Sequence, residues 1–380
     1  MNQQFLRLLH PDPAYHPVIV EPDVFNSLKE EGLKHGLLML LYKQLKDHKK
    51  DWVPNDHLLR FLEELRPFYL SNVARSMVQE HVEKEVISLL TKEGIPAVVI
   101  KGNALAREVY GDVNCRSSCD VDILVRRSDV FRVAEILEDA GYQRGGKDKD
   151  LPLSYCVYRL HHAGYVHPKS GLLIEVHWNF GFPFLFRLSS EEIWREGVSN
   201  ISGETRLSPE MTIIGLLIHY HSHSFNALRI LLDILWALYR YRDAVDWKSF
   251  VTRLQKIGLI KTAQITLAQM ENLWGDTLDH EAPPCLLGRE IGKMGRRKPK
   301  LLLSYFCIDS FEDHLHLYKR RAVGRLALDS ISAVILSYLK TLLPPAKAIK
   351  GLYGDRRNWV LPLNYLRYIR WRTKEWLASW

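Results

Sequence analysis

The sequence predicts an α+β fold, in which a small mixed sheet with helices is flanked by helical N- and C-terminal regions. Before about residue 90 and after about residue 208, apolar residues recur every three or four positions, as in amphipathic helices. Between these regions, short β-branched runs alternate with short helical segments. The expected division is a helical N-terminal region (1–88), an α/β core (89–205) and a helical C-terminal domain (206–380).

The N-terminal region is expected to contain two long helices. The stretches are "DVFNSLKEEGLKHGLLMLLYKQLKDH" (23–48) and "ARSMVQEHVEKEVISLLTKEG" (74–94). Both repeat apolar residues at helical spacing, and Gly94 marks the end of the second.

The α/β core is expected to alternate strands and helices. "IPAVVI" (95–100) predicts a buried strand, and "NALAREVYG" predicts a short helix ending at Gly111. "CDVDILV" (119–125) predicts a second strand, followed by a helix with Ser128 as N-cap and Gly141 at its end. The stretch 154–180 predicts two more strands joined by an "HPKSG" turn.

The C-terminal domain begins with a well-marked helix start. Ser208 is the expected N-cap, Pro209 the first helical position and Glu210 an acid in the first turn. Further helices are expected in "NALRILLDILWALYRYRDAV" and "LDSISAVILSYLKTLL". The Gly/Pro/basic stretches 288–300 and 343–358 are expected to be exposed connections.

The composition is that of a folded, soluble protein, with 380 residues, 47% apolar and 25% charged. We expect neither a signal peptide nor a spanning helix, because the most apolar stretch, 326–343, is interrupted by Asp329 and Lys340. Five scattered cysteines fit reduced thiols in a cytoplasm. Cys115 and Cys119 have a metal-binding spacing, but packing is favoured because no second pair follows.

The net charge of +8 favours a polyanionic ligand, such as a nucleotide, a nucleic acid or an anionic membrane surface. A basic surface that aids solubility explains the same charge.

Two carboxylates lie in the strand "CDVDILV". Successive side chains of a strand point to opposite faces, so Asp120 and Asp122 share a face. Two like charges held side by side repel each other, and a metal ion between them removes that cost. The pair therefore predicts a metal site.

Two flanking segments strengthen this prediction. Lys101 and Gly102 lie where the first strand turns into a helix, a place suited to binding phosphate. In "LLIEVHW", Glu175 and His177 share a face. If that strand lies beside 119–125, Glu175 becomes a third carboxylate, and the three suit two Mg²⁺ ions.

These segments together resemble a known family. "VVIKGNALAREVYGDVNCRSSCDVDILV", "LLIEVHW" and "HYHSHSFNALRILLD" are similar to the bacterial uncharacterised nucleotidyltransferases of the DNA-polymerase-β-like superfamily. The resemblance covers about residues 75 to 240. It implies a polymerase-β-like core and an enzyme that moves a nucleoside monophosphate from ATP or another NTP to an acceptor hydroxyl, with release of pyrophosphate. Two Mg²⁺ ions are the implied cofactors, and Mn²⁺ is an expected substitute.

The resemblance also implies roles for individual residues. Asp120, Asp122 and Glu175 are the implied catalytic and metal-binding residues. The implied nucleotide-binding residues are Lys101, Gly102, Arg116, His219, His223, Arg229 and Asp233. The superfamily's usual Gly-Ser turn is Lys101-Gly102 here, and its third aspartate is Glu175, which is expected to be a metal ligand or the general base.

The pair His219 and His223 has three open interpretations. The residues lie one helical turn apart, a spacing that can bind zinc. They can equally line the nucleotide or acceptor cleft, or hydrogen-bond between helices.

The tail "NYLRYIRWRTKEWLASW" (364–380) mixes arginines with aromatic residues. Such mixing suits bases or a membrane surface. The favoured interpretation is an amphipathic helix whose buried face is formed by Leu366, Ile369, Thr373, Trp376 and Trp380.

Two rival functions stay open. One is a toxin-like or tRNA-directed nucleotidyltransferase, which fits the basic balance of the chain. The other is a non-catalytic, nucleotide-binding regulatory protein. The acceptor is expected to be a small molecule, a peptide, a protein or an RNA.

Overall fold

The computed structural model describes residues 1–16, 22–47, 56–182, 184–201, 204–275, 282–293, 325–354 and 361–378. The strands are β1 (Ala97–Val99), β2 (Asp120–Val125), β3 (Gln143–Gly145), β4 (His162–Val166), β5 (Leu173–His177), β6 (Val198–Ile201) and β7 (Glu204–Leu207). The α-helices are α1 (Gln3–Leu8), α2 (Phe25–His35), α3 (Leu38–Asp47), α4 (Asp56–Lys92), α5 (Gly102–Leu105), α6 (Val130–Asp139), α7 (Leu153–Arg159), α8 (Ser190–Gly197), α9 (Pro209–Ser222), α10 (Leu228–Arg240), α11 (Trp247–Ile257), α12 (Ile260–Trp274), α13 (Pro283–Lys293), α16 (Ile331–Leu342), α17 (Ala346–Tyr353) and α18 (Leu361–Ala378).

The central sheet is mixed, as predicted. Its strand order is β1-β2-β5-β4-β3, with β2 and β5 parallel and the other neighbours antiparallel. In the β2–β5 pair, Val121 lies opposite Ile174, and Ile123 lies opposite Val176. These four apolar side chains are buried on one face of the sheet, so the alternate residues of both strands lie on the other face. The predicted α+β fold class is confirmed.

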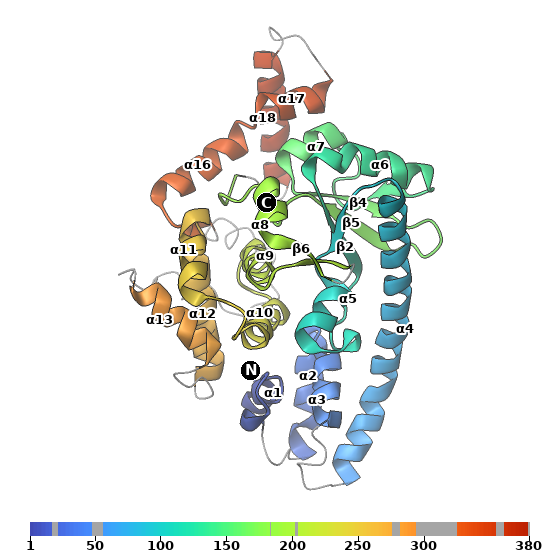
Figure 1. Ribbon diagram of the computed structural model, residues 1–380, viewed down its shortest axis with the longest axis vertical. Helices are drawn as coiled ribbons and strands as arrows, with labels where there is room; N and C mark the ends of the chain where they lie inside the picture. Colours follow the sequence, from blue (N-terminus) through green and yellow to red (C-terminus); the bar gives the residue numbers. More distant parts are fainter. Residues whose placement is uncertain are drawn as a thin grey trace.

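The long helix α4 runs beside the sheet and extends to α3 (Figure 1). It is continuous over 37 residues, and Gly94 follows it in the left-handed conformation. The predicted single helix over 23–48 is wrong in one respect. Gly36 adopts a φ of 65° and separates α2 from α3.

Within the core, the two strands predicted in 154–180 are present as β4 and β5, and the "HPKSG" stretch (167–171) joins them. The residues at the start of 154–180 form helix α7 rather than part of a strand, because Tyr155 packs against α17 and α18. Ser128 does not cap α6; a 3₁₀ turn, Arg127–Asp129, precedes that helix. The short strand β3 and the hairpin β6–β7 are additional to the predicted strands.

The helix α9 starts as the sequence predicts. Ser208 accepts a hydrogen bond from the backbone N–H of Met211, and Pro209 is the first helical residue. Helices α10 and α16 fall within the other two predicted stretches.

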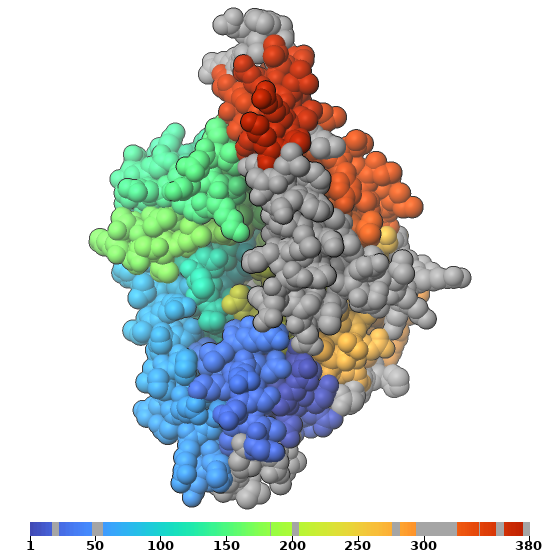
Figure 2. Space-filling view, turned by 180° about the vertical axis from the view of Figure 1, so that it is seen from behind, coloured from blue at the N-terminus to red at the C-terminus, as the bar shows by residue number. Residues whose placement is uncertain are grey.

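The C-terminal helices differ more from expectation. Ala346–Tyr353, expected to be an exposed connection, forms α17, which packs on α7 through Ala348 and Ile349. The stretch 288–293 belongs to α13, and 294–300 lies outside the described residues. Figure 2 shows α17 and α18, in red, at the opposite end of the molecule from the N-terminal helices.

The tail forms helix α18, but the face predicted to be buried is wrong. Tyr368 and Asn364 are buried, whereas Leu366 is 65% exposed and Ile369 is also exposed. Tyr368 is buried because it packs in the cluster that contains Tyr155, Ala348 and Ile349. The side chains of Trp376 and Trp380 lie outside the described residues.

Two apolar clusters enclose the sheet. One contains residues of α1–α4 together with α9–α13, and it reaches the sheet through Val98 and Leu124. The other lies on the opposite face and contains Val82 and Val86 of α4 with the apolar side of α6. Helix α4 contributes residues to both clusters. The division at residues 88 and 205 stays a prediction. Within the described ranges, every helix is too short or too polar to cross a bilayer.

Candidate functional site

The parallel pairing of β2 with β5 brings two predicted carboxylates together. Asp122 lies opposite Glu175 in the register, on the sheet face away from Val121 and Ile123. The Nε2 atom of His177, two residues further along β5, is 2.7 Å from Asp122 Oδ1 and 3.2 Å from Glu175 Oε2. Asp122, Glu175 and His177 each place one potential ligand atom within 4.8 Å of the others. These three groups can hold a metal ion.

Asp120 lies on the same face of β2 but outside this group of three. Its Oδ1 accepts a hydrogen bond of 2.9 Å from Ser118 Oγ. Gln79 of α4 donates to the backbone oxygen of Ser118 and so supports the loop before β2. The structure thus keeps the predicted D-x-D pair on one face, with Asp120 beside the Asp122–Glu175 pair.

Lys101 lies at the turn between β1 and α5, where the sequence predicts a phosphate-binding position. Its Nζ is 2.6 Å from Asp122 Oδ1, so Lys101 contacts the carboxylate. Gly102 has a φ of 55°, a conformation that a residue with a side chain rarely adopts. The glycine therefore allows the sharp turn that presents Lys101 to Asp122.

The charges around Asp122 give the two aspartates different acidities. Burial raises the pKa of Asp122, but Lys101 and the hydrogen bond from His177 outweigh it and hold that pKa well below its usual range. Burial and the neighbouring charge of Asp122 raise the pKa of Asp120. Asp120 is thus the carboxylate whose negative charge is least compensated.

The pKa values of the neighbouring histidines are also shifted in opposite directions. Burial and Lys101 lower the pKa of His177, but its bonds to Asp122 and Glu175 raise it above the ordinary value. Burial, and then the charge of His177, lowers the pKa of His162 to about 4. His161 is shifted downward more strongly, again by burial first. Near pH 7, His161 and His162 are therefore neutral.

Arg116 and Asp233, two predicted nucleotide-binding residues, contact each other. Arg116 Nε lies 3.1 Å from both carboxylate oxygens of Asp233, and the Tyr110 hydroxyl donates to the same carboxylate at 2.8 Å. All three side chains are buried. This cluster joins α10 to the segment before β2, and the prediction that Arg116 and Asp233 bind nucleotide stays a prediction.

The remaining predicted residues lie at the edge of the site. Arg229 donates a hydrogen bond of 3.0 Å to the backbone oxygen of Ser117. The rings of His219 and His223 meet edge to face, with centroids 4.6 Å apart. Burial, and then the charge of Lys101, lowers the pKa of His219 well below its ordinary value. Among the described side chains, no third metal-ligating group joins the two histidines.

The sequence reasoning missed His161 and His162. They lie at the start of β4, and each places its ring near His177. The adjacent "HH" before a strand was the available signal, but its meaning depends on β4 pairing with β5.

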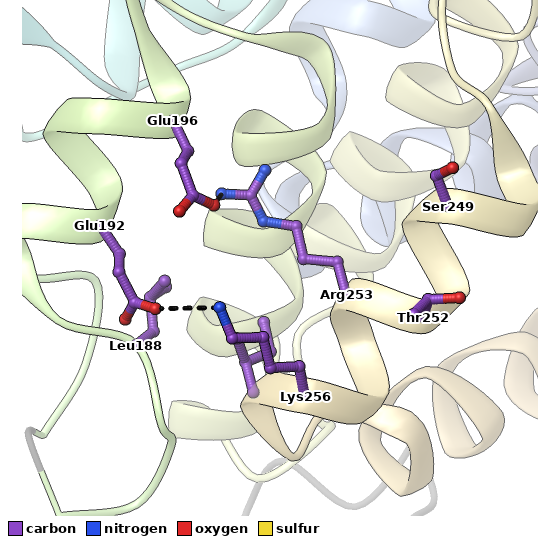
Figure 3. Close-up of a pocket in the computed structure, with 8 residues that line it drawn as sticks. Leu188, Glu192, Glu196, Ser249, Thr252, Arg253 and Lys256 are labelled. Carbon is purple, nitrogen blue, oxygen red and sulfur yellow. Dashed lines mark hydrogen bonds and ion pairs between the residues drawn. The ribbon is translucent and has the colours of Figure 1, made fainter.

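A surface pocket of about 300 Å³ lies between α8 and α11, away from these residues (Figure 3). Its charged side chains are paired across it, Glu192 with Lys256 at 3.4 Å and Glu196 with Arg253 at 2.9 Å. None of the predicted site residues lines it.

We compared the sequence with known protein families, curated proteins and solved structures. The sequence pattern of the family described as "Uncharacterised nucleotidyltransferase" matches residues 33–275, a stretch that contains all ten predicted site residues. No curated protein and no solved structure matches the chain. The chain therefore belongs to this family of uncharacterised nucleotidyltransferases, and it is an enzyme of the transferase class.

Proposed function

We propose that this enzyme uses Mg²⁺ to transfer a nucleoside monophosphate from an NTP to an acceptor hydroxyl, with release of pyrophosphate. The observation that carries the proposal is the register of β2 and β5, which sets Asp122 opposite Glu175. Asp120 adds a third carboxylate to the same face of β2. Carboxylate oxygens are the ligands that Mg²⁺ prefers.

The site offers three carboxylates, and their oxygens are suitable ligands for Mg²⁺. Asp120 is only partly exposed, and burial together with the charge of Asp122 raises its pKa, so a cation bound there relieves an unfavourable interaction. Asp120, Asp122 and Glu175 are the proposed ligands. When bound, Mg²⁺ supplies positive charge to the triphosphate and makes the acceptor hydroxyl a better nucleophile.

Lys101 is the proposed phosphate-binding residue. Its ammonium lies 2.6 Å from Asp122, beside the Gly102 turn over which the triphosphate is proposed to bind. An ammonium binds phosphate as a point charge, and Lys101 places it at the start of α5. We further propose that His219, His223 and Arg229 line the nucleotide or acceptor side of this face, and that Arg116 and Asp233 hold α10 beside it.

The proposal is tested by incubating the protein with each α-labelled NTP, Mg²⁺ and a cell lysate. We expect label in an acceptor and one pyrophosphate for each transfer. Label confined to a tRNA fraction, with strongly salt-dependent binding, identifies the tRNA-directed alternative. Nucleotide binding without pyrophosphate release identifies the non-catalytic, regulatory alternative and rejects the proposal.

Asp120→Asn provides the matched test of the site. We expect activity to fall by roughly 100-fold or more, the scale of losing one electrostatic stabiliser. Stability should be unchanged or higher, because the substitution removes like-charge repulsion. The exposed Asp139→Asn variant of α6 is the control and should keep full activity. Near-native activity in Asp120→Asn contradicts the assignment of Asp120.

A further inference from the structure

Three histidines gather at the start of β4 and the end of β5. The antiparallel pairing of these strands places His162 directly opposite His177. His161 is fixed just before β4, because its backbone oxygen accepts the N–H of Trp178 at 3.0 Å. Ring centroids are 4.6 Å apart for His161–His162 and 5.0 Å apart for His162–His177. One ring nitrogen from each histidine lies within 4.8 Å of the other two.

Each of these imidazoles has an unused nitrogen. The Nδ1 atoms of His161, His162 and His177 are buried and have no hydrogen-bond partner. A buried polar atom without a partner is costly, and three such atoms on neighbouring rings favour a ligand. A bound cation satisfies such nitrogens, since a neutral imidazole nitrogen is an electron-pair donor.

The second nitrogen of His177 is already bound in a way that suits metal ligation. Its Nε2 donates to Asp122 Oδ1 at 2.7 Å. Histidine ligands commonly donate their other ring N–H to a carboxylate, which fixes the ring and makes it a better ligand. The carboxylate of Asp122 therefore fixes the ring of His177 beside the other two histidines.

We propose that His161, His162 and His177 form a second metal site, selective for a borderline transition-metal cation such as Zn²⁺. Imidazole nitrogen suits Zn²⁺ and Co²⁺, whereas Mg²⁺ prefers the oxygen ligands of the adjacent carboxylates. Three protein ligands leave a fourth position for water or another ligand, as in catalytic zinc sites. The proposal rests on the histidine geometry, and the site shares His177 with the Asp122–Glu175–His177 group.

The test is a titration of the chelator-treated full-length protein with Co²⁺ in the absence of nucleotide. A tetrahedral, nitrogen-rich site gives intense visible absorption bands, whereas Co²⁺ on carboxylates and water gives weak ones. We expect intense bands that saturate at about one equivalent of Co²⁺, as one three-histidine site requires. Zn²⁺ should remove the bands, and about 100-fold excess Mg²⁺ should leave them, because the two cations prefer different ligands.

The variants His161→Gln and His162→Gln decide the ligand set. Loss of even an outer partner of a metal ligand costs about 10–100-fold in affinity, so loss of a ligand should cost at least about 100-fold. His81→Gln, which changes an exposed histidine of α4, is the control and should bind Co²⁺ like the wild type. Circular dichroism melts select the variants that remain folded.

Two results overturn the proposal. One is the absence of intense Co²⁺ bands in the wild type. The other is wild-type binding in either folded histidine variant. If one variant does not fold, the other is sufficient, because each removes a different proposed ligand. Asp120→Asn should retain the bands, and their loss there together with retention in His161→Gln assigns the ion to the carboxylates instead.

Discussion

Asp120 and Asp122 carry the same side chain two residues apart, yet their surroundings give them opposite acidities. Asp122 contacts Lys101 and His177, and these two groups hold its pKa far below the ordinary value despite its burial. Asp120 has a hydroxyl partner, Ser118, and its pKa is raised by burial and by Asp122. Asp120 is thus the position at which an added cation relieves the most repulsion.

Glu175→Gln tests the third proposed ligand. Glu175 lies in register with Asp122, so we expect its loss to raise the Mg²⁺ concentration needed for half-maximal activity. Added Mn²⁺ should partly restore the rate, because it binds the same ligands more tightly. Metal titrations of activity give the answer. If the metal requirement stays constant while the acidic limb of the pH–rate profile changes, Glu175 is the general base instead.

Glu83, on α4 near Gly102, carries a buried carboxyl. Burial raises its pKa from 4.5 to about 7. Because the pKa of Glu83 is higher in the folded state, the Glu83 carboxyl of the unfolded chain loses its proton at a lower pH than that of the folded protein. The corresponding stability is present below pH 4.5 and is lost as the pH rises toward 7.

We therefore expect Glu83→Gln to stabilise the protein increasingly as the pH rises. The difference in the free energy of unfolding between variant and wild type should grow by about 2 kcal/mol between pH 5 and pH 8. Urea unfolding at both values measures it. Glu30→Gln, at an exposed position of α2, should change stability by less than about 0.5 kcal/mol at either pH. A pH-independent difference for Glu83→Gln contradicts the prediction.

At the scale of elements, the sequence predicted those helices and strands whose conformation depends mainly on residues that are close in the sequence. Polar and apolar residues alternate over 120–123 of β2 and 174–177 of β5, and α9 has a side-chain cap followed by proline, so these elements were predictable. Helix α7 and strand β3 were missed because their conformations depend on distant partners. Residues 153–159 become helical where they pack on α17, almost 200 residues away in the sequence.

Asp233→Asn tests the buried cluster that joins α10 to the segment before β2. The substitution leaves Arg116 buried beside an uncharged amide, so we expect a loss of about 3–5 kcal/mol in the free energy of unfolding. The double variant Arg116→Met/Asp233→Leu should lose less, because no charge is left unpaired. Denaturant unfolding compares the three proteins. An equal loss in single and double variants shows that packing, rather than charge pairing, holds α10.

At the scale of the whole molecule, the candidate site was only partly predictable. Asp120, Asp122 and Glu175 stand out because carboxylates interrupt apolar strands. The pairing of Arg116 with Asp233 and of His177 with Asp122 could not be predicted, since the paired residues are 117 and 55 positions apart in the sequence. Such pairs depend on how the sheet and helices assemble, which composition and spacing do not encode.

The N-terminal helices share one apolar core with α9–α13. The variant Phe5→Ala measures how much this core contributes to stability. The Phe5 side chain is 0% exposed in that core. We expect a loss of about 3–5 kcal/mol on forming the cavity, measured by denaturant unfolding. Phe131→Ala, at a side chain that is 46% exposed on α6, should cost much less. Equal effects contradict a common core.

The contacts of α1 also bear on how the chain folds during synthesis. The indole N–H of Trp274 donates to the backbone oxygen of Leu6, across 268 residues of sequence, and that of Trp236 donates to Leu9. At about 5–20 residues per second, a ribosome needs roughly 13–54 s to make that intervening chain. Until then the apolar residues of α1 lack their partners on α12 and have only earlier elements such as α3 to pack against. We expect the nascent chain to depend on chaperones that shield this first segment.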